Sequence, residues 1–186
     1  MTNQGVGPRY LVDIVRTYRH YKTLGERAIA QVSDADLHTL VDPDANSIAV
    51  IVKHVAGNLR SRFSDFLTTD GEKPNRDRDA EFDMPHRASR DDVVGWWEDG
   101  WAIALGSLES LTPDDLERTV TIRGESFLVL EAVNRLAAHT AYHVGQIVLL
   151  AKHFAGPKWT SLSIPKGQSK NVEGTYKQGI TPTARG

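Results

Sequence analysis

The feature that most constrains this chain is the spacing of its apolar residues. Apolar side chains recur every three to four positions, the repeat of one face of an α-helix, in four long segments: residues 8–32, 47–67, 91–111 and 126–154. A short β-branched run at residues 119–124 has room for a two-stranded turn but not for a larger sheet. The pattern therefore predicts an all-α fold built from four amphipathic helices.

The connections between these segments predict how the helices are arranged. About 20 residues join the second segment to the third, and extended chain covers up to about 3.3 Å per residue, whereas a 20-residue helix is about 30 Å long. This connection can therefore run the full length of a bundle and allow the second and third helices to lie parallel. The shorter joins favour antiparallel neighbours. We expect a four-helix bundle with a long helix 2–helix 3 crossover.

Composition divides the chain into a bundle and a tail. The expected bundle covers residues 1–155. Residues 156–186 are rich in Gly, Pro and basic side chains, and Glu173 is the only acid among them. We expect this irregular C-terminal tail to pack on the bundle surface or to be partly disordered.

The charge balance and the residue types exclude several function classes. Lys and Arg total 22 against 24 Asp and Glu, for a net charge of −2, which lacks the positive excess of a dedicated nucleic-acid binder. The longest apolar runs, residues 48–52 and 147–151, are far shorter than the about 20 residues of a membrane span. The chain has no cysteine, so a small molecule must supply any thiol chemistry. We expect a cytoplasmic protein without nucleic-acid or membrane partners.

Three histidines lie on helix faces that should turn toward the core. His139 and His143 are four residues apart and therefore lie one above the other on the apolar face of the last segment. His54 interrupts the apolar face of the second segment. Buried imidazoles need polar partners, because an unsatisfied buried polar group costs roughly 2 kcal/mol or more. A shared metal ion would satisfy all three, and hydrogen bonds alone are the alternative.

Three polar residues are candidates to orient a ligand or substrate around this trio: Asn58, Gln146 and Arg62. Asn58 lies one turn from His54, and Gln146 lies three residues beyond His143, so either side chain can reach toward a metal ligand. Ordinary satisfaction of polar groups is the alternative for these residues.

No general base is visible from the spacing of residues. The nearest carboxylate on the histidine face of the last helix is Glu131, about 12 Å along the helix axis from the first histidine. The charges of residues 70–82 are most simply those of a solvated loop, although Arg76 and Arg78 could pair with an anionic substrate. The missing base argues more strongly against a hydrolase function than against a transferase function, because a thiolate needs only activation by the metal.

Several motifs together resemble the DinB-like superfamily. They are HVAGNLRSRF, which begins at His54, the charged stretch DGEKPNRDRDAEF, HTAYHVGQI with the histidine pair, and SLSIPKGQSK in the tail. The resemblance covers essentially the whole chain and is closest to a branch described only as a domain of unknown function. It implies an up-down-down-up bundle, often a homodimer, and one divalent metal per chain on His54, His139 and His143. Nickel or zinc is the commonest metal in the superfamily, and histidine nitrogen also suits iron and copper.

The resemblance also implies a function. Three protein ligands leave one coordination position open, as in catalytic metal sites. Some superfamily members are metal-dependent transferases or isomerases that use low-molecular-weight thiols such as bacillithiol or mycothiol. The first hypothesis is therefore a metal-dependent transferase with a small thiol cosubstrate and an electrophilic substrate. The alternatives are a non-enzymatic dimeric bundle with a structural metal site and a metal-dependent hydrolase.

Overall fold

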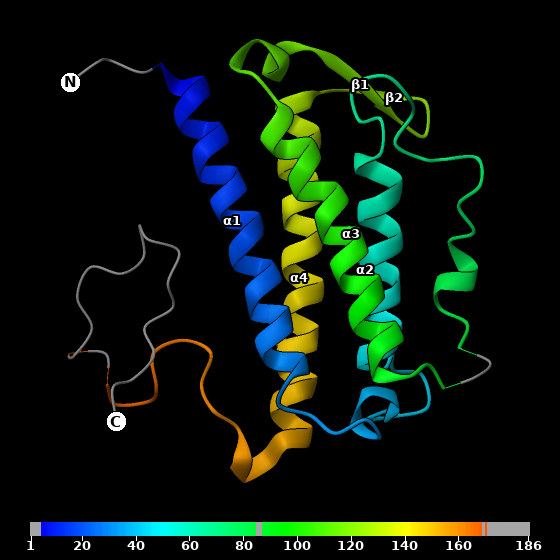
Figure 1. Ribbon diagram of the computed structural model, residues 1–186, viewed down its shortest axis with the longest axis vertical. Coiled ribbons are helices and arrows are strands. Elements are labelled where there is room, and N and C mark those ends of the chain that lie inside the picture. Colours follow the sequence, from blue (N-terminus) through cyan, green and yellow to red (C-terminus); the bar gives the residue numbers. More distant parts are fainter. Residues whose placement is uncertain (1–4, 85–86, 169, 171–186) are drawn as a thin grey trace.

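The computed structural model describes residues 5–84, 87–168 and 170, and in this part the chain is a helical bundle (Figure 1). Its elements in chain order are α1 (Val6–Ile29), η1 (Asp36–His38), α2 (Ile48–Phe63), η2 (Asp79–Glu81), α3 (Arg90–Ser110), η3 (Pro113–Glu117), β1 (Thr119–Ile122), β2 (Glu125–Leu128), α4 (Val129–Ala155) and η4 (Gly156–Lys158). The all-α prediction is confirmed. Given their length and apolar content, none of the described helices could traverse a lipid bilayer.

The four helices run in the up-down-down-up order. Figure 1 shows α1 and α4 running in one direction and α2 and α3 running in the other. The packing is closest between α2 and α3 and between α1 and α4. The connection from α2 to α3 passes along the outside of the bundle and includes η2 (Figure 1). The long crossover expected from the loop length is therefore present, and it gives α2 an additional neighbour.

Helix α2 is the most enclosed element of the fold. Of its residues only Lys53, Gly57 and Arg60 are not buried. This segment was expected to be an amphipathic helix, and nearly all of its residues are buried because α3, α4 and η2 all contact it. Polar groups on α2 must therefore find partners inside the protein.

Local signals explain the helix boundaries. The side chain of Ser47 caps α2, and Ser89 forms a capping box with Asp92 at the start of α3. Helix α4 begins at Val129 rather than at the expected residue 126. The reason is that residues 125–128 form strand β2, which pairs antiparallel with β1.

The hairpin is attached to the beginning of the long connection. Arg123 and Gly124 have positive φ angles of 56° and 76° in the tight turn between the strands. The carboxylate of Asp70 accepts hydrogen bonds from both of their backbone N–H groups, and the N–H of Gly71 donates to the carbonyl of Thr121 at 2.8 Å. Backbone hydrogen bonds lower the pKa of Asp70 to about 2. These contacts place the Arg123 side chain beside the connection from α2 to α3.

The first residues of the tail lie against α1. Leu162 is buried, and its carbonyl accepts a hydrogen bond from Arg27. The backbone N–H of Thr160 donates to the side-chain oxygen of Gln31 at 2.7 Å. Residues 169 and 171–186 lie outside the described part of the chain, so the expectation for the rest of the tail falls there.

Candidate metal centre

The fold brings three histidines together at the interface of two helices. His54 comes from α2, and His139 and His143 come from successive turns of α4. Each offers a ring nitrogen, and these nitrogens all lie within 4.8 Å of one another. His54 is buried, and the other two are half-buried. The three rings are close enough to share one metal ion.

A buried carboxylate orients the His54 ring. The Nδ1–H of His54 donates to Oε2 of Glu81 at 2.8 Å. Arg76 donates to the same carboxylate from Nε at 2.8 Å and from Nη2 at 2.9 Å, as a two-pronged pair. With Nδ1 engaged as a donor, Nε2 is the His54 nitrogen left to bind a metal, which is the usual carboxylate–histidine–metal arrangement.

Several neighbours act on the charge and position of Glu81. Burial opposes ionisation of this carboxyl, but the hydrogen bonds from His54 and Arg76 outweigh it, and the pKa of Glu81 is lowered. The carboxylate also approaches α2 very closely, since a Cβ placed on Gly57 would come within 2.3 Å of Oε1. Only glycine at this position of α2 leaves room for the carboxylate in its present place.

The α4 histidines are held neutral with free lone pairs. Nδ1 of His143 donates to Oε1 of Gln146 at 2.8 Å, and Nε2 of His143 is buried with no hydrogen-bond partner among the described residues. Burial and then the neighbouring imidazoles lower the pKa of His139 to about 3. Burial also lowers the pKa of His143, although its bond to Gln146 opposes this. A buried imidazole nitrogen without a partner fits a metal ligand, so the donor set suits a divalent ion.

The histidine cluster opens into a pocket of about 480 Å³. The lining residues come from α2, α4, the hairpin turn and the connection before α3: His54, Asn58, Arg62, Arg76, Arg78, Phe82, Arg123, Arg135, Leu136, Ala138, His139, Tyr142 and His143. Its volume lies in the range of small-molecule sites. A small ligand can therefore reach the histidine nitrogens from this side.

The residues expected to orient a ligand lie in three different environments. Gln146 contacts a histidine directly. Asn58 is buried at the pocket wall, and its Oδ1 has no hydrogen-bond partner within the described ranges. Arg62 is buried and donates to the carbonyl of Gly71 and to Oε2 of Glu72, the latter at 2.9 Å. Arg62 therefore anchors the beginning of the long connection as well as lining the pocket.

The carboxylate of this site was not predicted from the sequence. Residues 70–82 were expected to form a solvated loop, but Glu81 and the side chain of Arg76 are buried. Glu131 was expected to be the nearest carboxylate on the α4 histidine face, whereas Glu81 reaches the cluster from a different segment. Helical spacing does not predict a contact made by an irregular loop. The only local signal is Gly57, a residue without a side chain on the face that the loop crosses.

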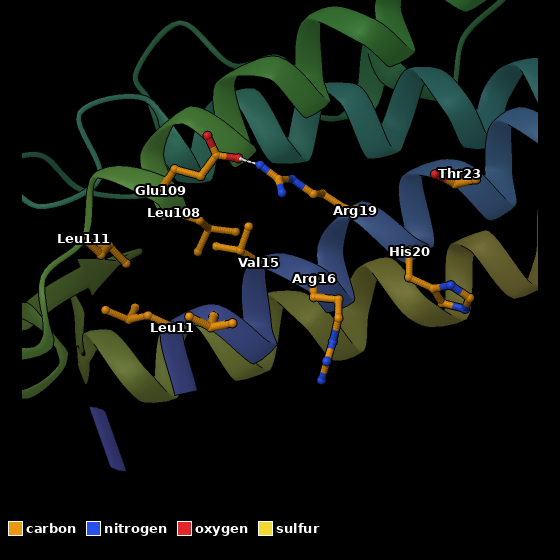
Figure 2. A pocket seen from close by; sticks show the side chains of 10 residues that line it. Leu11, Val15, Arg16, Arg19, His20, Thr23, Leu108, Glu109 and Leu111 are labelled. Carbon is orange, nitrogen blue, oxygen red and sulfur yellow. Dashed lines mark hydrogen bonds and ion pairs between the residues drawn. The ribbon is translucent and has the colours of Figure 1, made fainter. Parts of the chain in front are cut away.

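A second pocket, of about 560 Å³, lies between α1 and α3 (Figure 2). Arg19 pairs with Glu109 across it at 2.7 Å, and His20 is the only histidine among its described lining residues. Although this pocket is the larger one, it lacks a group of three metal-ligating side chains in the described residues. It provides reference positions for arginine and histidine substitutions away from the cluster.

Two comparisons with known proteins bear on the family of this chain. A comparison with curated proteins gave no match. The family described as "Protein of unknown function (DUF1572)" matches residues 5–168. This match covers most of the 186-residue chain. The chain therefore belongs to this family of unknown function.

Proposed function

We propose that this protein is a metal-dependent transferase of the DinB-like superfamily that uses a low-molecular-weight thiol. One divalent ion, nickel or zinc, would be held by His54, His139 and His143. The observation that carries this proposal is the buried, unpartnered Nε2 of His143 beside two further imidazoles at the wall of a small-molecule pocket. We place the protein in the cytoplasm, where small thiols are kept reduced.

The surrounding residues have defined roles in this proposal. Glu81 fixes the orientation of the His54 ring and increases the basicity of its other nitrogen. Gln146 does the same for His143 through a neutral hydrogen bond. When bound, the metal supplies positive charge that favours the deprotonated form of a thiol at neutral pH. The hydrogen bond from Arg76 to Glu81 keeps this carboxylate beside the His54 ring.

The transfer step conserves atoms and electrons. The thiol loses its proton to solvent, and a sulfur electron pair forms the new S–C bond. The leaving group departs with the electron pair of the bond that breaks. The chain contributes by holding both reactants in the pocket beside the histidines, which is the proximity effect of any two-substrate site.

The environment of the carboxylates favours transfer over hydrolysis. A hydrolase needs a base that can accept a proton from water. Glu81 is already committed to His54 and Arg76, and none of the described residues that line the pocket is acidic. A small thiol brings its own nucleophile and does not need such a base.

An assay with a generic electrophile tests this proposal. The protein is loaded with nickel and mixed with 2-mercaptoethanol and 1-chloro-2,4-dinitrobenzene, whose chloride is displaced by sulfur. We expect the protein to accelerate product formation and His139→Ala to abolish the acceleration. His20→Ala, in the second pocket, should retain it. Equal rates with wild type, His139→Ala and buffer would contradict the transferase proposal.

The second candidate function is a non-enzymatic bundle with a structural metal. The positions of the metal ligands on two different helices favour it. His54 belongs to α2 and the other two histidines to α4, so one ion would cross-link two helices of the bundle. In this case chelation should lower the melting temperature sharply, while 2-mercaptoethanol should leave the absorption spectrum of the nickel-loaded protein unchanged.

A further inference from the structure

The pocket beside the histidines has an unusual charge. None of its described lining residues is acidic. Five of them are arginines: Arg62, Arg76, Arg78, Arg123 and Arg135. The protein as a whole has a net charge of −2. The positive charge is therefore concentrated at this pocket, which is the electrostatic complement of an anionic ligand.

Two carboxylates behind the pocket wall neutralise part of this charge. Glu72 pairs with Arg62 at 2.9 Å and with Arg123 at 2.8 Å. Glu81 pairs with Arg76 and with one of the histidines. These three arginines thus share two carboxylates, and their contacts hold the loop and the hairpin in place. Their first role is structural.

The other two arginines are far less engaged. The guanidinium of Arg78 lies 3.7 Å from Asp79, a pair exposed to solvent in which the carboxylate side chain is 98% accessible. Such pairs contribute little. Arg135 stacks over the ring of Phe127 at 5.8 Å and has no acidic partner in the described part of the chain. Arg78 and Arg135 are exposed residues that line the pocket, and neither guanidinium is held by a strong carboxylate partner among the described residues.

Both of these arginines flank the histidine cluster. Arg135 and His139 are four residues apart on α4 and lie on the same face, about one turn or roughly 6 Å apart along the axis. From the opposite wall, the Arg78 guanidinium lies 5.1 Å from the ring of Phe82, which in turn lies 4.7 Å from the ring of His54. A ligand bound at the histidines would thus extend between two cationic groups.

A further unpartnered group lines the same pocket. Asn58 is 7% exposed, and its Oδ1 has no hydrogen-bond partner among the described residues. Burying such a group without a partner is costly. A polar ligand in the pocket would supply the missing hydrogen bond.

We infer that the small molecule bound at the histidine cluster carries a carboxylate or phosphate group, and that Arg78 and Arg135 bind this group. The inference rests on the proposed function, because it specifies a ligand of the same site. Guanidinium groups match both anions through paired N–H donors. The one-turn spacing indicates a short molecule, with the anionic group a few bonds from the atom held at the histidines.

Two thiols that differ only in charge test this inference. 3-Mercaptopropionate and 3-mercapto-1-propanol are titrated into nickel-loaded protein at constant ionic strength, and the sulfur-to-nickel absorption band reports binding. We expect the wild type to bind the carboxylate about tenfold more tightly. The double variant Arg78→Gln/Arg135→Gln should remove this preference, and Arg19→Gln in the second pocket should retain it. Equal affinities in the wild type, or a preference unchanged in the double variant, would overturn the inference.

A metal-independent measurement separates this inference from the proposed function. The melting temperature of the metal-free protein is recorded with inorganic phosphate and with propionate, each against chloride at equal ionic strength. A rise in the wild type that is lost in the double variant supports the anion site, even when neither thiol produces a band and the transferase proposal fails. No rise with either anion would overturn the inference. The anion with the larger effect identifies a phosphate or a carboxylate ligand.

Discussion

The two walls of the histidine cluster are built differently. On α2, His54 is 3% exposed and its ring is fixed by a buried chain of charged groups through Glu81 to Arg76. On α4, the histidines are half-buried, and His143 is held by the exposed side chain of Gln146. The α2 wall is therefore the more buried and the more rigidly held, and the α4 wall is the more exposed, although residues of both line the pocket.

This difference assigns separate tasks to the two walls. A ligand held by a buried ion pair is preorganised, since neither its tautomer nor its orientation can change without breaking charged hydrogen bonds. The half-exposed histidines of α4 cost less desolvation free energy than a fully buried side chain. Their exposure also leaves access for a second ligand. If the assignment is correct, substitutions behind His54 should cost far more than substitutions behind His143.

The largest effect is expected for Glu81→Ala. Removal of this carboxylate leaves the guanidinium of Arg76 buried without its main partner, and breaking a buried ion pair costs about 3–5 kcal/mol. Urea unfolding of the metal-free protein measures the change. Gln146→Ala, at the opposite wall, should cost below about 1 kcal/mol because its side chain is exposed. Similar losses in the two variants would break the comparison.

Gly57→Ala displaces the same carboxylate without removing it. The new Cβ would lie 2.3 Å from Oε1 of Glu81, so the carboxylate must shift from the position in which it holds the His54 ring. We expect nickel affinity to fall about 10–100-fold, as for the loss of other groups that orient metal ligands. Competition with a chelator of known affinity gives this value.

The matched control is Gly145→Ala on α4, where an added Cβ meets nothing within 4 Å. Its nickel affinity should equal that of the wild type. Its stability should rise by about 0.5–1 kcal/mol, because alanine is the better helix former. Reduced affinity in both alanine variants would show that the loss does not come from Glu81.

Gln146→Ala should have a smaller effect on metal binding than Gly57→Ala. The lost hydrogen bond to His143 is neutral and lies at an exposed side chain, so the ring can be rehydrated. We expect a loss of nickel affinity of about tenfold at most. A loss larger than that of Gly57→Ala would reverse the assignment of the rigid wall.

Acid should destabilise the metal-free protein through His139. The pKa of His139 is about 3 in the fold and about 6.5 in the unfolded chain. As the pH falls, the unfolded state therefore binds the proton before the folded state does. The folded state keeps its full stability above about pH 6.5 and loses stability as the pH falls toward 3. His139→Gln should flatten the dependence of unfolding free energy on pH in this window. An unchanged slope would contradict the half-buried, neutral state of this ring.

The periodic parts of the molecule could be predicted from the sequence. The spacing of apolar residues located the four helices, and the length of one connection indicated that α2 and α3 lie parallel. The same periodicity placed the three histidines on inward faces, because helical geometry relates residues four apart without knowledge of the rest of the fold. The errors at helix ends come from local competition, as where residues 125–128 pair in a strand instead of beginning α4.

The parts that depend on irregular chain could not be predicted. Glu81 reaches His54 only because the connection from α2 to α3 passes over α2, and no repeat relates the two residues. Arg123 enters the pocket from a hairpin turn, which is likewise outside helical spacing. Charged residues in the connection have the composition of a solvated loop, and their burial becomes evident only when their partners are known.

Each function proposed for the pocket depends on one metal ion bound by the three histidines. The most direct test of this metal site is elemental analysis of the purified protein, prepared without a histidine tag, beside the variant His54→Ala/His139→Ala/His143→Ala. We expect about one divalent ion per wild-type chain and its loss from the variant. Little metal in both proteins, even after nickel or zinc is added, would contradict it.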